Sequence, residues 1–133
     1  MKPLPEEWLR LAQEDFFSAK ILYKEAVWNH VCFHAQQAAE KSLKALLETK
    51  KRVKKIHDLL ELAEETEKAG FDLEAFRPIL EFLNQFYTST RYPFLIAMLQ
   101  GSIPGKKHAD QALENLDDLL HFVSKRLKFK SKS

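Results

Sequence analysis

Apolar residues recur at intervals of three and four along most of the chain, the spacing that places them on one face of an α-helix. Proline is tolerated just before a helix, because the first backbone N–H groups have no partner inside the helix. Pro3 and Pro5 precede the first run and mark its start. The pattern predicts a helix over about residues 5–27. Its apolar residues are Leu9, Ala12, Phe16, Ala19, Leu22 and Ala26.

Alanine and leucine dominate the next run, which predicts a second helix over about residues 29–50. Short alanine side chains allow a neighbouring helix to approach closely. Basic residues between 50 and 55 follow the run, and cations are favoured near a helix C-terminus. The expected buried face consists of Ala35, Ala38, Ala39, Leu43, Leu46 and Leu47.

Two shorter helices are expected in the middle of the chain. Asp58 and Glu61 form a plausible capping pair for a helix that ends near Ala69, before Gly70. Asp72 is a candidate cap for the next helix. Pro78 fits only in the first turns of a helix, so a later start is the alternative. The expected buried residues of this helix are Leu73, Phe76, Leu80, Leu83 and Tyr87.

The C-terminal part begins with the least regular segment, residues 88–105, which contains an apolar run at 94–99. A last helix is predicted over about residues 106–128 from leucines and a valine at three-four spacing. No strand pattern is present. The sequence therefore predicts an all-α fold, an up-and-down bundle of four to five helices. A length of 133 residues suits one domain over 1–133, with a flexible basic tail at about 129–133.

Charge and cysteine content restrict the possible functions. The net charge is only +2, so no global basic field indicates a nucleic-acid partner. Basic residues do cluster at 50–55 and at 125–132, either as a solvated loop and tail or as a local phosphate-binding surface. The single cysteine, Cys32, excludes an internal disulfide and is expected to be buried and inert. No membrane span is expected, and a cytoplasmic location is the default.

A polar row accompanies the apolar face of the second helix. Spacings of four, three, four and three place its members on one helical face, where they form either a solvated surface or a site for phosphate. The row consists of His30, His34, Gln37, Lys41 and Lys44. His30 and His34 have a spacing that can bind a metal, but no neighbouring ligand completes the set. We therefore expect no metal and no cofactor.

Two further segments carry candidate chemistry. His57 lies just before the expected helix start at Asp58, where it either anchors the helix or acts as a catalytic or nucleotide-contacting group. Tyr87, Arg91 and Tyr92 lie in or beside the irregular segment. An Arg flanked by aromatic rings can bind phosphate while a ring stacks on a base, or it can pair with a carboxylate across an interface.

Several segments together resemble the HEPN domain, a small helical module associated with nucleotides and RNA. The resemblance implies a four- or five-helix bundle that usually forms a homodimer. It also implies an association with a minimal nucleotidyltransferase, often in toxin–antitoxin or related pairs. The segments that carry it are Trp8–Ala12, Asp15, Ala35–Lys41 with Lys44, Ile56–Leu59 and Thr90–Pro93.

Many HEPN proteins are metal-independent ribonucleases with an Arg followed, after four to six residues, by a His. The His moves a proton of the ribose 2′-OH, and the Arg stabilises charge on the phosphorane. Arg91 is the counterpart of that Arg, but Ile96, Ala97 and Met98 occupy the positions of the His. The resemblance therefore leaves as an alternative a catalytic pair of Arg91 with a His from another segment, His34, His57 or His108, of which His57 is our candidate.

Three functions remain open at this point. The leading one is a nucleotide- or RNA-binding protein that works with a nucleotidyltransferase. Its ligand-binding residues would be His34, Gln37, Lys41, Lys44, Tyr87, Arg91 and Tyr92. The second is a metal-independent ribonuclease toxin with a non-standard Arg/His site. The third is a non-catalytic module that self-associates through residues 94–99.

Overall fold

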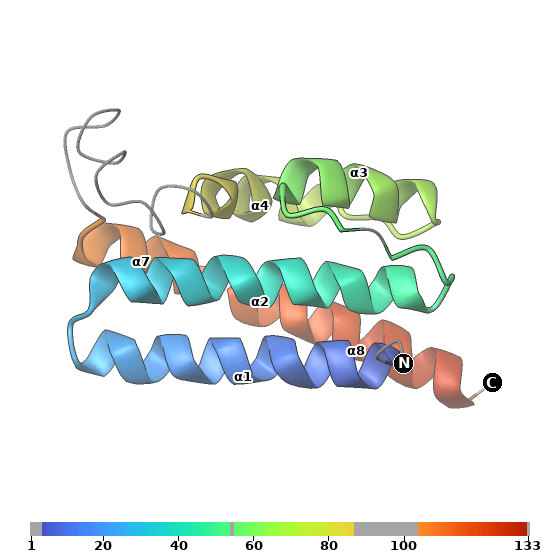
Figure 1. Ribbon diagram of the computed structural model, residues 1–133, viewed down its shortest axis with the longest axis horizontal. Helices are drawn as coiled ribbons and strands as arrows, with labels where there is room; N and C mark the ends of the chain where they lie inside the picture. The colour runs from blue at the N-terminus through green and yellow to red at the C-terminus, as the bar shows by residue number, and fades with distance from the viewer. Residues whose placement is uncertain (1–3, 54, 87–103, 133) are drawn as a thin grey trace.

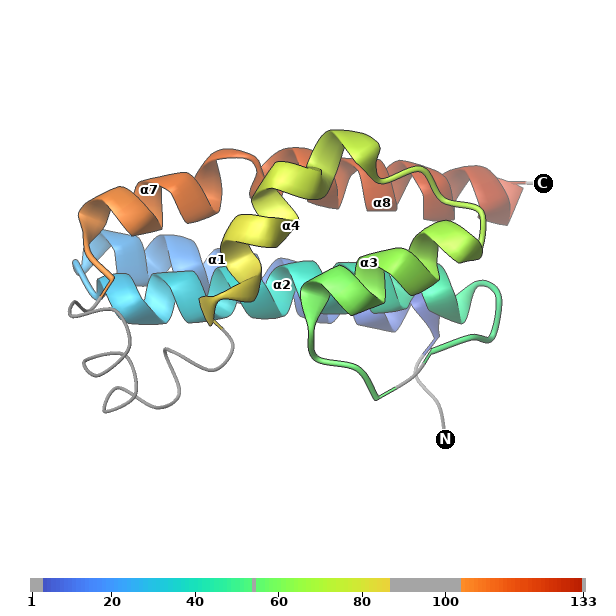
Figure 2. The same ribbon diagram turned by 90° about the horizontal axis from the view of Figure 1, so that it is seen from above.

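The computed structural model describes residues 4–53, 55–86 and 104–132, and every regular element in these ranges is helical. Two long antiparallel helices, α1 and α2, lie side by side, and α8 runs behind them (Figure 1). Turned by 90°, the bundle shows α3 and α4 over α2, with α7 and α8 along one side (Figure 2). The helices are α1 (Pro5–Lys24), α2 (Trp28–Glu48), α3 (Leu59–Lys68), α4 (Arg77–Asn84), α7 (Lys106–Glu114) and α8 (Leu116–Lys132). The predicted all-α bundle is confirmed.

Helix α2 is the centre of the bundle and contacts α1, α3, α4, α7 and α8. All six residues expected on its buried face are inaccessible to solvent. Ala12 and Ala19 of α1 are buried as well. Small side chains on both helices let the two backbones approach closely, which explains why α1 and α2 share the most extensive contact in the fold.

The turn between α1 and α2 corrects the prediction for Ala26. Helix α1 ends at Lys24, and Ala26 is exposed in the left-handed region with φ 60°. The Ala26 N–H donates to the Tyr23 carbonyl and the Val27 N–H to the Leu22 carbonyl, both at 3.0 Å. This pattern ends a helix with a left-handed residue, usually Gly. The expected helix over 5–27 is therefore too long.

The start of α3 agrees with the predicted cap. Asp58 Oδ1 accepts hydrogen bonds from the N–H groups of Leu60 and Glu61, each at 3.0 Å. Asn84, the last residue of α4, accepts a bond from the Leu59 N–H at 2.7 Å. The end of α4 is thereby fastened to the start of α3, directly beside His57. The helix ends at Lys68, and Gly70 follows with φ 105°, as expected for its role as a stop.

The later start proposed for the fourth helix is confirmed. Asp72 accepts a bond from the Glu74 N–H at 3.0 Å, but it caps only a short 3₁₀ turn, η1 (Glu74–Phe76). Helix α4 begins at Arg77 and places Pro78 in its first turn. Proline is accepted there because no N–H is needed. Tyr87 and most of the irregular segment lie outside the described residues.

The last predicted helix is two helices. The break falls at Asn115, whose φ of −110° and ψ of 1° end α7. Helix α8 continues past the expected end at 128 to Lys132. Leu116, Leu120 and Val123 are buried as predicted, so the apolar spacing is correct for α8 even though the helix is interrupted.

None of the described helices is long and apolar enough to cross a membrane.

Candidate functional site

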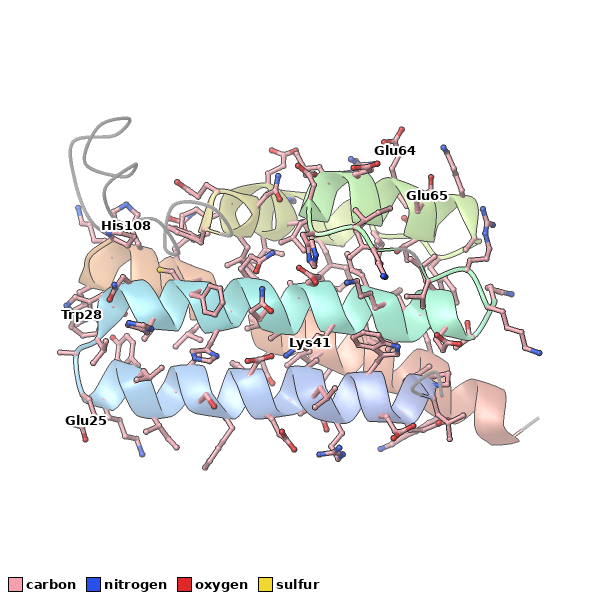
Figure 3. The ribbon with its side chains drawn as sticks, viewed as in Figure 1. Glu25, Trp28, Lys41, Glu64, Glu65 and His108 are labelled. Atoms are coloured by element: carbon pink, nitrogen blue, oxygen red, sulfur yellow. The ribbon has the colours of Figure 1, made fainter. Side chains whose placement is uncertain are left out.

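The polar row of α2 does not form a plain solvated surface. His30 is exposed, but the side chains of His34 and Lys41 are only 28% and 26% exposed, and that of Lys44 is 8% exposed. Lys41 lies between α2 and the neighbouring α1 (Figure 3). The row therefore runs along the contacts of α2 with other parts of the bundle, and its charges require partners.

One partner is Asp15 of α1, which together with His34 and Lys41 forms what we call the Asp15 cluster. Lys41 Nζ donates to Asp15 Oδ2 at 2.6 Å, and His34 Nδ1 lies 2.8 Å from Asp15 Oδ1. Burial by itself would raise the pKa of the Asp15 carboxyl. The hydrogen bonds and charges of His34 and Lys41 outweigh it, so this pKa lies below its ordinary value. The carboxylate thus joins α1 to α2 as an ion.

The second partner is Glu40, the centre of what we call the Glu40 cluster: Glu40, Lys44, His57 and Gln36. Lys44 Nζ donates to Glu40 Oε2 at 3.0 Å, one helical turn away on α2. His57 Nδ1, from the loop before α3, lies 3.1 Å from the same oxygen. The Glu40 side chain is 5% exposed, whereas that of His57 is 51% exposed. A buried carboxylate therefore orients a histidine that reaches the surface.

Glutamines complete the Glu40 cluster. Gln36 Nε2 lies 3.4 Å from both Glu40 Oε1 and the backbone carbonyl of His57. Gln36 Oε1 accepts a bond from Gln37 Nε2 at 2.7 Å. These contacts bring one member of the row, Gln37, into the network that holds His57. Gln36 is itself fully buried, so the network is part of the packed interior.

Trp8 of α1 covers the lysine of the Glu40 cluster. Lys44 Nζ lies 5.6 Å from the centroid of the Trp8 ring, within the range of a cation–π contact. The Trp8 indole nitrogen is buried and has no hydrogen-bond partner among the described residues. The ring thus acts here through its face, which helps to keep a charged amine in a nearly buried position.

The electrostatic balance of the two clusters limits their chemistry. Lys41 and Lys44 are matched by Asp15 and Glu40, so the four groups together carry no net charge. Each cluster also contains a histidine, whose ring nitrogens can donate or accept a hydrogen bond. The arrangement is suited to hydrogen bonding and proton exchange rather than to strong attraction of anions by itself.

Metal chemistry and cysteine chemistry have little basis in the described part of the chain. No group of three His, Cys, Asp or Glu residues is placed there to hold a metal ion. Cys32 is buried, and burial raises the pKa of its thiol to about 12. The thiol therefore stays protonated at neutral pH and is not a nucleophile.

The predicted site residues fall into two groups. His34, Lys41, Gln37, Lys44 and His57 come together in the two clusters. Tyr87, Arg91 and Tyr92 lie outside the described residues.

Reasoning from sequence missed three members of the clusters: Asp15, Gln36 and Glu40. A signal for the first was present, because Asp15 interrupts an apolar face between Ala12 and Ala19. A carboxylate at such a position must find a partner. Glu40 carries a similar signal, since it stands one turn after Gln36 and one turn before Lys44.

These features define a class of protein: a small helical bundle whose central helix carries a partly buried polar network that reaches the surface at one histidine. The sequence model of the HEPN domain matches residues 5–127. The chain belongs to the HEPN domain family.

Solved structures agree with this assignment. The chain is similar to TT1696 from Thermus thermophilus, with 26% identity over 91% of this chain and 96% of that chain, and a TM-score of 0.79. It is also similar in fold to ST0689, described as an archaeal HEPN homologue, with 23% identity, 94% and 98% coverage, and a TM-score of 0.69. No curated protein matches the chain.

Proposed function

We propose that this HEPN protein binds the phosphate groups of a nucleotide or of RNA where the polar row of α2 meets His57. The observation that carries the proposal is the Glu40 cluster, in which a buried carboxylate holds a half-exposed histidine beside that row. The HEPN resemblance supports a nucleotide or RNA as the ligand. It also supports a homodimer that acts with a nucleotidyltransferase, in a toxin–antitoxin-type or related system.

Arg91 is the residue that we expect to supply the decisive charge. Lys41 and Lys44 are already matched by carboxylates, so an incoming phosphate needs a further cation. A guanidinium binds phosphate with two parallel hydrogen bonds, and Tyr87 and Tyr92 could stack on a base. In this proposal the clusters position His34, Gln37 and His57, while Arg91 provides most of the affinity.

The test is a binding titration with ATP and with a fluorescent single-stranded RNA. The double variant Arg91→Ala/Lys41→Ala should lose binding while keeping a cooperative urea transition. Lys24→Ala, which removes an exposed lysine at the end of α1, is the matched control and should bind like the wild type. Unchanged affinity in the double variant would refute the proposal.

The partner is tested separately by co-expressing the chain with minimal nucleotidyltransferases of its own organism. A complex that survives size-exclusion chromatography is the expected result. Two separate peaks at micromolar concentration would remove the partnership and leave the ligand proposal intact.

A second candidate, a metal-independent ribonuclease, is favoured by the bond between Glu40 and His57. A carboxylate at Nδ1 orients an imidazole, so that its other ring nitrogen can be positioned for general acid–base catalysis. Incubation with single-stranded RNA between about pH 5 and pH 9 should then give chelator-resistant cleavage. Arg91→Ala and His57→Ala should both abolish it. Intact RNA across this range would exclude the enzyme.

A further inference from the structure

Two of the large exposed apolar side chains of the described chain lie on the same face of α1. The large apolar side chains that are exposed in these ranges are Phe17 at 61%, Ile21 at 45% and Leu4 at 61%, the residue that precedes the helix. Phe17 and Ile21 are one turn apart and are neighbours on the helix surface. Large exposed apolar side chains grouped on one face are typical of an interaction surface.

Two hollows follow the seam between α1 and α8, which run in opposite directions, so that the start of α1 and the end of α8 lie at the same end of the bundle (Figure 1). The larger, about 350 Å³, is lined by Phe16, Phe17 and Lys20 of α1 and by residues of α8. The smaller, about 150 Å³, is lined by Leu9 of α1 and by Leu127 of α8. Ser124 and Lys128 of α8 line both, so the hollows form one continuous groove.

The groove and the exposed aromatic ring are related by a simple geometry. Phe17 and Leu9 are eight residues apart, about 12 Å along the helix axis. When two copies are related by a two-fold axis perpendicular to α1 at Gln13, Phe17 of each copy lies opposite Leu9 of the other copy. Phe17 of each copy then faces the smaller hollow of the other, where Leu9 and Leu127 supply apolar contacts beside Glu6, Ser124 and Lys128. Because each copy uses the same surface for this contact, the assembly is complete with two subunits.

Two charged residues on this face of α1 also fit the two-fold arrangement. Glu6 and Lys20 are both exposed and lie equally far from Gln13 along α1. In the antiparallel arrangement each Glu6 faces the partner's Lys20, so unlike charges meet at both ends. A parallel arrangement in register would instead bring like charges together, which is unfavourable.

We propose that α1 packs antiparallel against α1 of a second copy of this chain, with Phe17 of each copy seated in the α1–α8 groove of the other around an axis at Gln13. This proposal rests on the proposed function, which includes a homodimer, and it names the surface through which that homodimer forms. It differs from self-association through residues 94–99, the earlier alternative.

Sedimentation velocity over a range of protein concentrations tests the surface without any ligand. The wild type should form dimers, and Phe17→Glu should shift it to monomers with at least a tenfold weaker association. Gln111→Glu adds the same charge to an exposed position of α7 and should leave the dimer unchanged. A monomeric wild type, or a dimer that persists in Phe17→Glu, would overturn the proposal. Neither result depends on whether nucleotide or RNA is bound.

The arrangement of the two copies is tested by charge exchange. Glu6→Lys and Lys20→Glu should each weaken the dimer, and the double variant should restore it, because unlike charges again face each other. Double-variant protein that remains as weak as the singles would exclude the antiparallel register.

Cross-linking provides a test that does not depend on disrupting the fold. Cys32 is buried, so a Gln13→Cys variant presents its new thiol near the axis and should form a disulfide-linked dimer on mild oxidation. Gln111→Cys should remain monomeric under the same conditions. Equal cross-linking of the two variants would contradict an axis at Gln13.

Discussion

The two carboxylates beside the polar row of α2 have the same types of partner but different positions. Asp15 is bound by Lys41 at 2.6 Å and contacts His34 at 2.8 Å. Glu40 is bound by Lys44 at 3.0 Å and contacts His57 at 3.1 Å. Asp15 belongs to α1 while both of its partners belong to α2, so this cluster joins two helices. Glu40 and Lys44 share one helix, and only the histidine comes from elsewhere.

Burial separates the clusters further. The ion pair of the Glu40 cluster is the more deeply buried, at 5% and 8% exposure against 12% and 26% in the Asp15 cluster. Its histidine is the more exposed, at 51% against 28%. Similar groups are thus arranged differently: the Asp15 cluster fastens two helices, and the Glu40 cluster holds a histidine at the surface, where the proposed ligand would bind.

The largest expected effect comes from neutralising Glu40. Glu40→Gln leaves the nearly buried Lys44 without its anion, which should lower the free energy of unfolding by about 3–5 kcal/mol, measured by urea denaturation. The paired variant Glu40→Leu/Lys44→Met removes both charges and should cost far less. A paired variant as unstable as the single one would show that the ion pair is not the cause.

Neutralising Asp15 should have a smaller effect that depends on pH. Asp15→Asn removes charged hydrogen bonds and should lower the free energy of unfolding by about 1.5–3 kcal/mol near neutral pH. The pKa of Asp15 is lowered in the fold, so its contribution is complete above its ordinary value of 3.8 and is lost as the pH falls through the folded value. The wild type and the variant should therefore converge in acid. A constant difference across this pH range would contradict the assignment.

Removing the cap of α3 should cost about 1 kcal/mol. Asp58→Ala leaves the N–H groups of Leu60 and Glu61 without their acceptor and loosens the start of the helix beside His57. Thermal unfolding measures the loss, and ligand affinity should fall with it if His57 takes part in binding. Asp72→Ala, which removes the single bond to Glu74, is the control and should leave affinity unchanged.

The smallest effect on stability is expected for His57. Its side chain is half exposed, so His57→Ala should change the free energy of unfolding by no more than about 1 kcal/mol. The same change should clearly weaken binding of the RNA probe. His34→Ala should lower stability more than His57→Ala, because His34 holds Asp15 inside the bundle, and it should weaken binding less. Equal effects of the two variants on binding would remove the distinction between the clusters.

Local sequence was sufficient to predict most of the helices and several of their ends. The three-four spacing located α1, α2 and α8, Asp58 marked the start of α3 and Gly70 its end. Two boundaries could not be read in this way. Ala26 adopts a left-handed conformation that alanine disfavours. At Asn115 the helix breaks although the apolar spacing continues past it. In both cases the course of the chain is decided by the packing of helices that are distant in sequence.

The candidate site was predictable only in part. Spacing alone placed His34, Gln37, Lys41 and Lys44 on one face of α2. It did not show that Lys41 would meet Asp15 of α1, or that Glu40 would meet His57. Such contacts depend on the relative rotation and offset of separate elements, which a single helix does not encode.

The sequence by itself determined the helical class, the apolar face of the second helix and the set of polar residues on that helix, because helical periodicity is a local property. Only the tertiary structure decided which of those residues are neutralised, and that His57, from the loop before α3, joins them at the surface. Burial is a property of the packed bundle, and Lys41 has its carboxylate partner only because α1 brings Asp15 within hydrogen-bonding distance.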